Sequence, residues 1–283
     1  MSTAEPIPAP DLVNSTDTVR VAVHDLGGKG PTLLLAHATG FCGRVWEPVV
    51  ETIGSRFHCV ALDFRAHGHS TRPDRPLVWD GMADDVLAVV DRLAPTGPLA
   101  AVGHSMGGSA LALAEAKRPG TFRCVWAFEP ILFERTDDNA GPEPSPISAG
   151  ARKRRATFAT RREAYDRYRS RPPLAGLDDR ALRAYVDHGF ADTADGRVTL
   201  RCRPDDEAGV FEHHNTDAPA ALAGITIPYR LAASGDEQAP AEACRAIAAR
   251  HPHLELVTYE DLTHFGPLED PDRIAADVLA WLA

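Results

Sequence analysis

This sequence of 283 residues has no long apolar run, no paired-cysteine motif and no excess of positive charge. No segment approaches the roughly 20 consecutive apolar residues that a membrane-spanning helix needs. The polar, proline-bearing stretch from Met1 to Asp17 lacks the basic start and the apolar core of a secretion signal. The cysteines show no Cys-x-x-Cys spacing, so we expect reduced thiols in a cytoplasmic protein. They are Cys42, Cys59, Cys124, Cys202 and Cys244.

The charge balance is acidic, with 30 Lys and Arg residues against 40 Asp and Glu residues and a formal net charge of -10. Such a chain repels phosphate backbones and anionic lipid surfaces, so we expect neither a nucleic acid nor a membrane as its partner. One basic stretch departs from this balance, Arg152 to Arg155 with Arg161 and Arg162 beyond it. We interpret it as the solvated face of a helix rather than as an anion-binding patch.

Sequence signals for a cofactor are also absent. His67 and His69 lie close together, but their neighbours lack the further ligands that a closed metal site needs. The chain has no phosphate-binding Gly-x-x-x-x-Gly-Lys loop. We therefore expect no metal and no other cofactor.

Short apolar runs alternate with segments of helical periodicity, and hydrophobic residues make up 44% of the chain. The composition is that of a globular protein, and the alternation predicts an α/β fold with a mostly parallel sheet and helices on both faces. Val19 to Val23 is expected to be an antiparallel strand. The other predicted strands are residues 32–37, 59–63, 99–103, 124–128, 229–233 and 254–259, and the predicted helices are 80–93, 106–117 and 270–282.

The alternation stops between residues 131 and 220, where two helical stretches, 151–169 and 178–187, come without a strong signal for a buried strand. We therefore predict a helical cap at residues 131–220, inserted into an α/β core that is formed by residues 1–130 and 221–283.

Gly103-His104-Ser105-Met106-Gly107 has the Gly-x-Ser-x-Gly pattern of a nucleophile elbow, and it lies between a predicted strand and a predicted helix. Glycines on both sides tolerate a sharp turn, and the start of a helix favours developing negative charge. A serine that only capped the helix would not require both glycines. The pattern therefore predicts that Ser105 is a nucleophile.

A serine hydroxyl needs a base within hydrogen-bonding reach to attack near neutral pH. We predict that this base is His264, which lies in a loop after the last predicted strand, at the edge where the active-site loops of parallel sheets gather. A carboxylate is then needed to orient the imidazole. We predict Asp236, which follows the strand 229–233 and precedes the histidine. Glu237 and Glu129, at the end of the preceding strand, remain alternatives.

The negative charge of a tetrahedral intermediate is usually stabilised by preorganised backbone N–H groups. Met106 follows the nucleophile directly and is expected to supply one of them. We predict that Thr39, in the loop that follows the strand 32–37, supplies the other.

Together these features resemble the α/β-hydrolase fold superfamily, in its serine-nucleophile, esterase-like and lipase-like branch with a helical cap. The resemblance covers the whole chain and includes Asp63 to Ser70, which is similar to the family's Asp-x-Arg-Gly-His-Gly-x-Ser stretch and implies a structural loop. Ala66 and Ala38 depart from the glycines that are common there. Within the superfamily, a serine at the elbow implies acyl chemistry, whereas dehalogenases and epoxide hydrolases carry an aspartate.

We therefore predict a hydrolase that cleaves an ester, lactone or related acyl bond of a small, largely apolar substrate through an acyl-enzyme intermediate. Phe41, Trp46, His104 and Phe133 are expected to contact this substrate. Two alternatives stay open: carbon-carbon bond hydrolysis or cofactor-free haloperoxidase or oxygenase chemistry on the same fold, and a ligand-binding protein without turnover. A homodimer is equally open.

Overall fold

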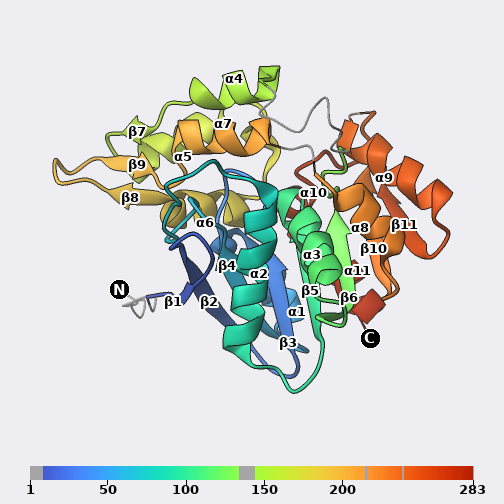
Figure 1. The fold of residues 1–283 in the computed structure, drawn as a ribbon. Helices are drawn as coiled ribbons and strands as arrows, with labels where there is room; N and C mark the ends of the chain where they lie inside the picture. The colour runs from blue at the N-terminus through green and yellow to red at the C-terminus, as the bar shows by residue number, and fades with distance from the viewer. Residues whose placement is uncertain (1–8, 134–143, 214–215, 238, 283) are drawn as a thin grey trace.

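An eight-stranded sheet forms the centre of the computed structural model, which describes residues 9–133, 144–213, 216–237 and 239–282 (Figure 1). The strand order is β1-β2-β4-β3-β5-β6-β10-β11. The pairs β1–β2 and β2–β4 are antiparallel, and the pairs from β4 to β11 are parallel. The predicted mostly parallel sheet is thus confirmed. The strands are β1 (Asp11–Asn14), β2 (Arg20–Gly28), β3 (Thr32–Ala36), β4 (His58–Asp63), β5 (Leu99–His104), β6 (Phe122–Phe128), β10 (Tyr229–Ser234) and β11 (Leu254–Tyr259).

Helices pack on both faces of this sheet and enclose two apolar cores. Along β3, Leu34 contributes to one core and Leu33 and Leu35 to the other, because successive side chains of a strand point to opposite faces. The first core contains side chains of α2 (Trp79–Leu93), α3 (Met106–Lys117), α8 (Ala218–Gly224) and α9 (Ala239–Arg250). The second contains side chains of α1 (Glu47–Ile53), α6 (Asp179–His188) and α11 (Pro271–Leu282). Figure 1 shows α2 and α3 lying over the sheet from one side.

Most core elements lie where the sequence predicts them, with boundaries that shift by one or two residues. Helix α3 spans the predicted residues, and β11 does so as well. The antiparallel strand β2 runs to Gly28 through a bulge between Asp25 and Gly27, so it is longer than predicted. Sequence reasoning missed β1, which is short and largely exposed. Among the described residues, no helix is both long enough and apolar enough to cross a bilayer.

The chain segment between β6 and β10, called the insertion below, is only partly helical. The predicted helix 151–169 is wrong in its middle: α4 (Pro146–Arg152) ends early, and α5 (Arg161–Arg169) begins where the Thr160 side chain accepts a hydrogen bond from the Glu163 N–H. A small antiparallel sheet lies within the insertion, in the order β7 (Thr157–Phe158), β9 (Val198–Leu200), β8 (Phe190–Asp192). Strands of two or three residues are too short to show the alternating pattern of a strand.

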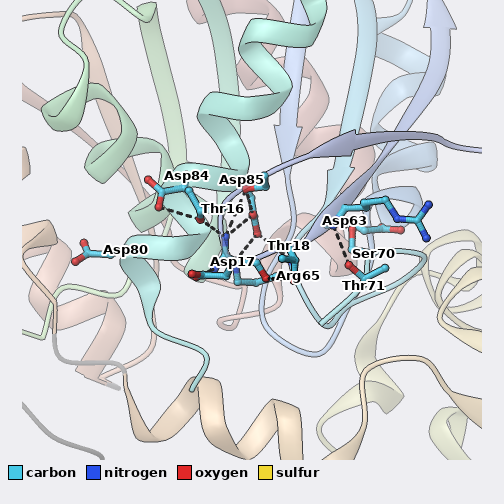
Figure 2. A network of polar contacts seen from close by, with 12 residues as sticks. Thr16, Asp17, Thr18, Asp63, Arg65, Ser70, Thr71, Asp80, Asp84 and Asp85 are labelled. Atoms are coloured by element: carbon cyan, nitrogen blue, oxygen red, sulfur yellow. Dashed lines mark hydrogen bonds and ion pairs between the residues drawn. The ribbon is translucent and has the colours of Figure 1, made fainter. Parts of the chain in front are cut away.

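A buried ion-pair network anchors the loop after β4 (Figure 2). The Arg65 Nε and Nη2 atoms donate to the two carboxylate oxygens of Asp85 in α2, at 2.9 and 2.8 Å. The backbone N–H of Arg65 donates to the same carboxylate at 3.0 Å. Arg65 also donates to Asp17 and Thr16 in the turn before β2. Both Arg65 and Asp85 are buried, so the network ties three separate segments to one point.

Candidate active site

The carboxyl ends of the parallel strands meet at one edge of the sheet, and the predicted catalytic residues gather there. Ser105 directly follows β5, Glu129 directly follows β6, and His264 lies in the loop after β11. The loop after β3 reaches the same place, because Thr39 lines a cavity together with Ser105 and His264. Parallel strands make this convergence a property of the fold.

Ser105 lies in a sharp turn between β5 and α3, with backbone angles φ 54° and ψ -120°. The turn requires glycine on both sides. A methyl group added at Gly107 would lie 2.3 Å from the carbonyl oxygen of Ala36, and one added at Gly103 would lie 2.7 Å from the Cα atom of Gly108. The Ser105 N–H donates to the carbonyl of Phe128 at 2.8 Å. The expected nucleophile elbow is therefore present, and its glycines allow the close approach of neighbouring backbone.

The imidazole of His264 lies within hydrogen-bonding reach of the serine. The Nε2 atom is 3.1 Å from Ser105 Oγ. The loop that carries His264 is held from two directions: His104 Nε2 donates to the carbonyl of His264 at 2.8 Å, and Thr263 donates to the carboxylate of Glu269. The predicted pairing of Ser105 with His264 is thus present in the structure.

The carboxylate that contacts the imidazole belongs to Glu129 and not to Asp236, the residue that the sequence favoured. The Nδ1 atom of His264 is 2.5 Å from Glu129 Oε2. The other oxygen, Oε1, accepts a hydrogen bond from the backbone N–H of Ser234 at 2.7 Å. Burial by itself would raise the pKa of Glu129, but hydrogen bonds and charge from His264, with the Ser234 N–H, lower it below its usual value. An ionised carboxylate therefore faces the imidazole.

Asp236 lies in the next loop along the sheet edge. Its backbone N–H donates to Ser234 Oγ at 3.3 Å, and its carbonyl accepts from Arg245 at 2.9 Å. One signal in the sequence pointed to Glu129: it ends a run of buried apolar residues, directly before Pro130. A carboxylate at the end of a buried strand needs a partner in the fold. Here that partner is the imidazole.

Two buried histidines hold the loop after β3 in place. His37 Nδ1 donates to the carbonyl of Ala38 at 2.7 Å, and its Nε2 accepts from the Phe64 N–H at 3.1 Å. His67 Nε2 accepts from the Gly40 N–H at 3.0 Å. Burial lowers the pKa of His37 to about 4 and that of His67 to about 3, so both rings stay neutral near neutral pH. Neutral rings are required, because each Nε2 atom accepts a hydrogen bond.

The stretch from Asp63 to Ser70 therefore supports the site without entering it. The Asp63 carboxylate accepts from the Gly43 N–H at 2.6 Å, and it also accepts from His24 and from the His69 N–H. These contacts join the loops after β3 and β4. The structural role implied by the resemblance agrees with this arrangement.

Ser105 and His264 open into a cavity of about 520 Å³ between the sheet edge and the insertion. This volume is in the range of small-molecule sites. Phe41 and His104 line the cavity as predicted. Trp46 instead lies in the core, and Phe133 is not among the lining residues; its carbonyl accepts from the Thr216 N–H. The phenylalanine and tyrosine side chains that line the cavity are Phe41, Phe158, Tyr168, Tyr185, Phe211 and Phe265.

Basic side chains also line this cavity, which corrects the interpretation of residues 153–155; Arg152 is exposed on α4 and does not line the cavity. Lys153, Arg154 and Arg155 all contribute to the lining, as do Arg167 and Arg171 from the region of α5. Sequence reasoning treated the first three as a solvated helix face because α4 was expected to continue through them. The helix ends at Arg152, so the residues beyond it turn towards the cavity.

A serine on a strand-turn-helix elbow, facing a histidine and a carboxylate at the carboxyl edge of a parallel sheet, is the arrangement of an α/β-hydrolase scaffold. The chain matches the alpha/beta hydrolase family over residues 33–277 and belongs to that family.

Known proteins agree with this assignment. The chain is 33% identical to 2-(acetamidomethylene)succinate hydrolase of Mesorhizobium japonicum over 110 residues, a match that spans only 39% of each protein. It is 26% identical to the bifunctional esterase/perhydrolase DCH of Acinetobacter calcoaceticus over 286 residues, covering 95% of this chain and 98% of that one. The crystal structure of E-2-(acetamidomethylene)succinate hydrolase has a TM-score of 0.80 at 21% identity, covering 96% of this chain and 98% of that chain. That structure shares the fold.

Proposed function

We propose that this chain is a serine hydrolase that cleaves an ester, or a related acyl bond, through an acyl-enzyme intermediate. One observation carries the proposal: His264 bridges Ser105 Oγ at 3.1 Å and the ionised Glu129 carboxylate at 2.5 Å. A hydrogen-bonded serine, imidazole and carboxylate have the geometry needed to remove the hydroxyl proton as the serine attacks.

In the first half of the reaction, Ser105 Oγ attacks the carbonyl carbon while its proton passes to His264 Nε2. The imidazolium that forms is stabilised by Glu129, and it then protonates the leaving group as the acyl bond breaks. In the second half, His264 takes a proton from water, which attacks the acyl-serine ester. The acid product leaves, and Ser105 regains its proton.

The oxyanion of each tetrahedral intermediate would be held by the backbone N–H groups of Met106 and Thr39. Met106 begins α3, so its N–H is free of the helical hydrogen-bond pattern. Thr39 is nearly buried and lines the cavity beside Ser105, in the loop held by the two neutral histidines. A donor group that is fixed before the reaction loses little energy in reorganising.

The insertion would serve as a cap that shapes the substrate site. Its side chains Phe158, Tyr168 and Tyr185 line the same cavity as the serine. We place the protein in the cytoplasm, since its five cysteines are buried free thiols of the kind that a reducing compartment preserves.

The names of the relatives support an acyl substrate and add a second candidate activity. One relative is an esterase and perhydrolase, and others are methyl ester esterases. Perhydrolysis would use the same acyl-enzyme, with hydrogen peroxide in place of water as the group that accepts the acyl chain. Adding peroxide to the ester assay and measuring peracid separates the two activities.

Labelling with a fluorophosphonate tests the nucleophile directly. We expect the folded protein to be labelled on Ser105 and the Ser105→Ala protein to remain unlabelled, and we expect turnover of aryl esters or lactones. Folded protein that takes no label would favour a ligand-binding protein. Activity on a diketone, with none on any ester, would instead favour carbon-carbon bond hydrolysis.

A further inference from the structure

The cavity beside Ser105 is strongly basic, although the chain as a whole is acidic. Among the residues that the structure describes, five cationic side chains line it, against one carboxylate, that of Glu207. The formal net charge of the chain is -10, so this concentration opposes the overall balance. The cationic lining residues are Lys153, Arg154, Arg155, Arg167 and Arg171.

Two of these cations are already paired. Arg154 forms a close ion pair with Glu207, and this pair lies against Gly40 in the loop after β3. Arg155 pairs with Glu163 at 2.8 Å. These contacts neutralise their charges and fix the two guanidinium groups.

The other three cations have no ion-pair partner within the described ranges of the chain. Lys153 and Arg171 are exposed at the cavity, and Arg167 is half-buried. These three positive charges lie beside an apolar wall, and on that side the electrostatic field that they create in the cavity is only poorly screened by water. A cavity built only for neutral acyl chains would gain nothing from them.

Two hydroxyl groups add to the same surface. Arg154 Nη2 donates to Tyr185 Oη at 2.7 Å and to Tyr168 Oη at 3.3 Å. Each tyrosine accepts in these bonds, so its own O–H hydrogen is available as a donor. Both tyrosines line the cavity, and Tyr185 is buried. An anion bound here would therefore meet hydroxyl donors as well as positive charge.

We infer that the substrate carries a carboxylate group remote from the scissile acyl bond, and that Lys153, Arg167 and Arg171 bind this carboxylate. The inference rests on the proposed function and names the class of its substrate: a half-ester, or another monoacyl derivative, of a dicarboxylic acid. The apolar wall accommodates the chain between the two acyl carbons. The cationic groups select for the charged end.

Binding to the Ser105→Ala protein tests this inference without requiring turnover. The probes are monomethyl esters of dicarboxylic acids of three to six carbons, each compared by calorimetry with the matching methyl ester in which a neutral carboxamide replaces the free carboxylate. For at least one chain length, we expect the anionic ester to bind about tenfold more tightly, with an advantage that shrinks as salt is added. Equal binding of anion and amide at every length would overturn the inference.

Charge-removing variants locate the site. In the active enzyme, Arg167→Gln, Arg171→Gln and Lys153→Gln should each lower the ratio of kcat/KM for the anionic ester to that for the amide by about threefold to tenfold. The matched control is Arg162→Gln, which removes an exposed charge from the same helix as Arg167. Arg162 pairs with Asp166 and does not line the cavity. That variant should leave the ratio unchanged.

The outcomes separate this inference from the proposed function. Labelling of Ser105 with equal turnover of the charged and neutral esters would retain the hydrolase and refute the carboxylate site. Tight binding of the anion without labelling would retain the carboxylate site and refute the serine hydrolase. An equal fall of the kcat/KM ratio in Arg162→Gln would show a general charge effect and would overturn the assignment of the three cations to a carboxylate site. A stronger preference for phosphate-bearing esters than for carboxylate-bearing ones would overturn it as well.

Discussion

Replacing Glu129 by glutamine changes one oxygen of the candidate triad to an amide nitrogen at nearly constant volume. The backbone N–H of Ser234 decides which way the new amide faces. This N–H lies 2.7 Å from Oε1 and needs an acceptor, so the amide oxygen stays on that side. The amide NH₂ group must then face Nδ1 of His264, where Glu129 Oε2 lies at 2.5 Å.

A donor at that position reverses the tautomer of the imidazole. Nδ1 must accept the hydrogen bond from the amide, so the ring proton moves to Nε2, the atom that faces Ser105 Oγ at 3.1 Å. A protonated Nε2 cannot take the serine proton. The variant also loses the negative charge that stabilises the imidazolium in the transition state. Losses of this kind reduce kcat by about 10³ to 10⁴, or about 4 to 5 kcal/mol of barrier.

The assay is steady-state hydrolysis of an aryl ester, with the rate of fluorophosphonate labelling as a second readout. Asp236→Asn is the matched control, because it makes the same kind of change at the acid that the sequence favoured. We expect it to retain kcat within about threefold, since its loop lies beside the triad and not in it. Thermal unfolding of both variants checks that each is folded. A Glu129→Gln enzyme with nearly full activity, beside an Asp236→Asn enzyme that has lost it, would refute the assignment.

Three further predictions concern stability. Gly107→Ala should lower the free energy of unfolding, measured with urea, by about 1 to 3 kcal/mol, because the added methyl group would lie 2.3 Å from a backbone oxygen. Gly209→Ala is the control: its methyl group meets open space, so the change should be neutral or stabilising, and equal effects of the two substitutions would contradict the close-approach argument. Asp85→Asn should lower the free energy of unfolding by about 3 to 5 kcal/mol, because it leaves Arg65 buried beside a neutral amide. Asp84→Asn, at a half-buried carboxylate paired with Lys117 near the surface, should lower it by less than about 1 kcal/mol, and a small loss at both sites would count against the network. Finally, acid should destabilise the fold through the three buried histidines His37, His67 and His104, whose pKa values are lowered from 6.5 to about 4 or 3 in the folded protein. Below about pH 6.5 these histidines bind protons in the unfolded chain but stay neutral in the folded chain. Their contribution to the free energy of unfolding is therefore fully present above that pH, and it falls by about 1.4 kcal/mol per histidine for each pH unit below it. Urea titrations between pH 5 and 7.5 measure this slope, and a flat profile would contradict it.

Local patterns were enough to predict the elbow and most of the core. Ser105 lies between an apolar strand and an alanine-rich helix, with one glycine two residues before it and another two residues after it, so the turn is determined over a few residues. His264 followed from its place after the last strand. In both cases, the information lies within one short segment and its neighbours.

The third member of the triad depended on contacts between distant segments. β6 and β10 are paired parallel strands, with Phe128 opposite Ala232, so Glu129 and Asp236 both follow strands that end at the same edge. The Glu129 N–H donates to Ala232 at 2.8 Å, and its carboxylate accepts from Ser234. These contacts direct the side chain towards His264, and no pattern within either loop reveals them.

The cavity lining was beyond sequence reasoning for the same reason. Whether Lys153 and Arg154 face water or the cavity depends on where α4 ends and on how the insertion packs over the sheet edge. The sequence by itself determined the strand-turn-helix segments and the residue types available for catalysis, because short-range periodicity and backbone sterics act along the chain. Only the tertiary structure decided which carboxylate orients the imidazole and which cations surround the substrate, because both depend on distances between side chains that lie far apart in the sequence.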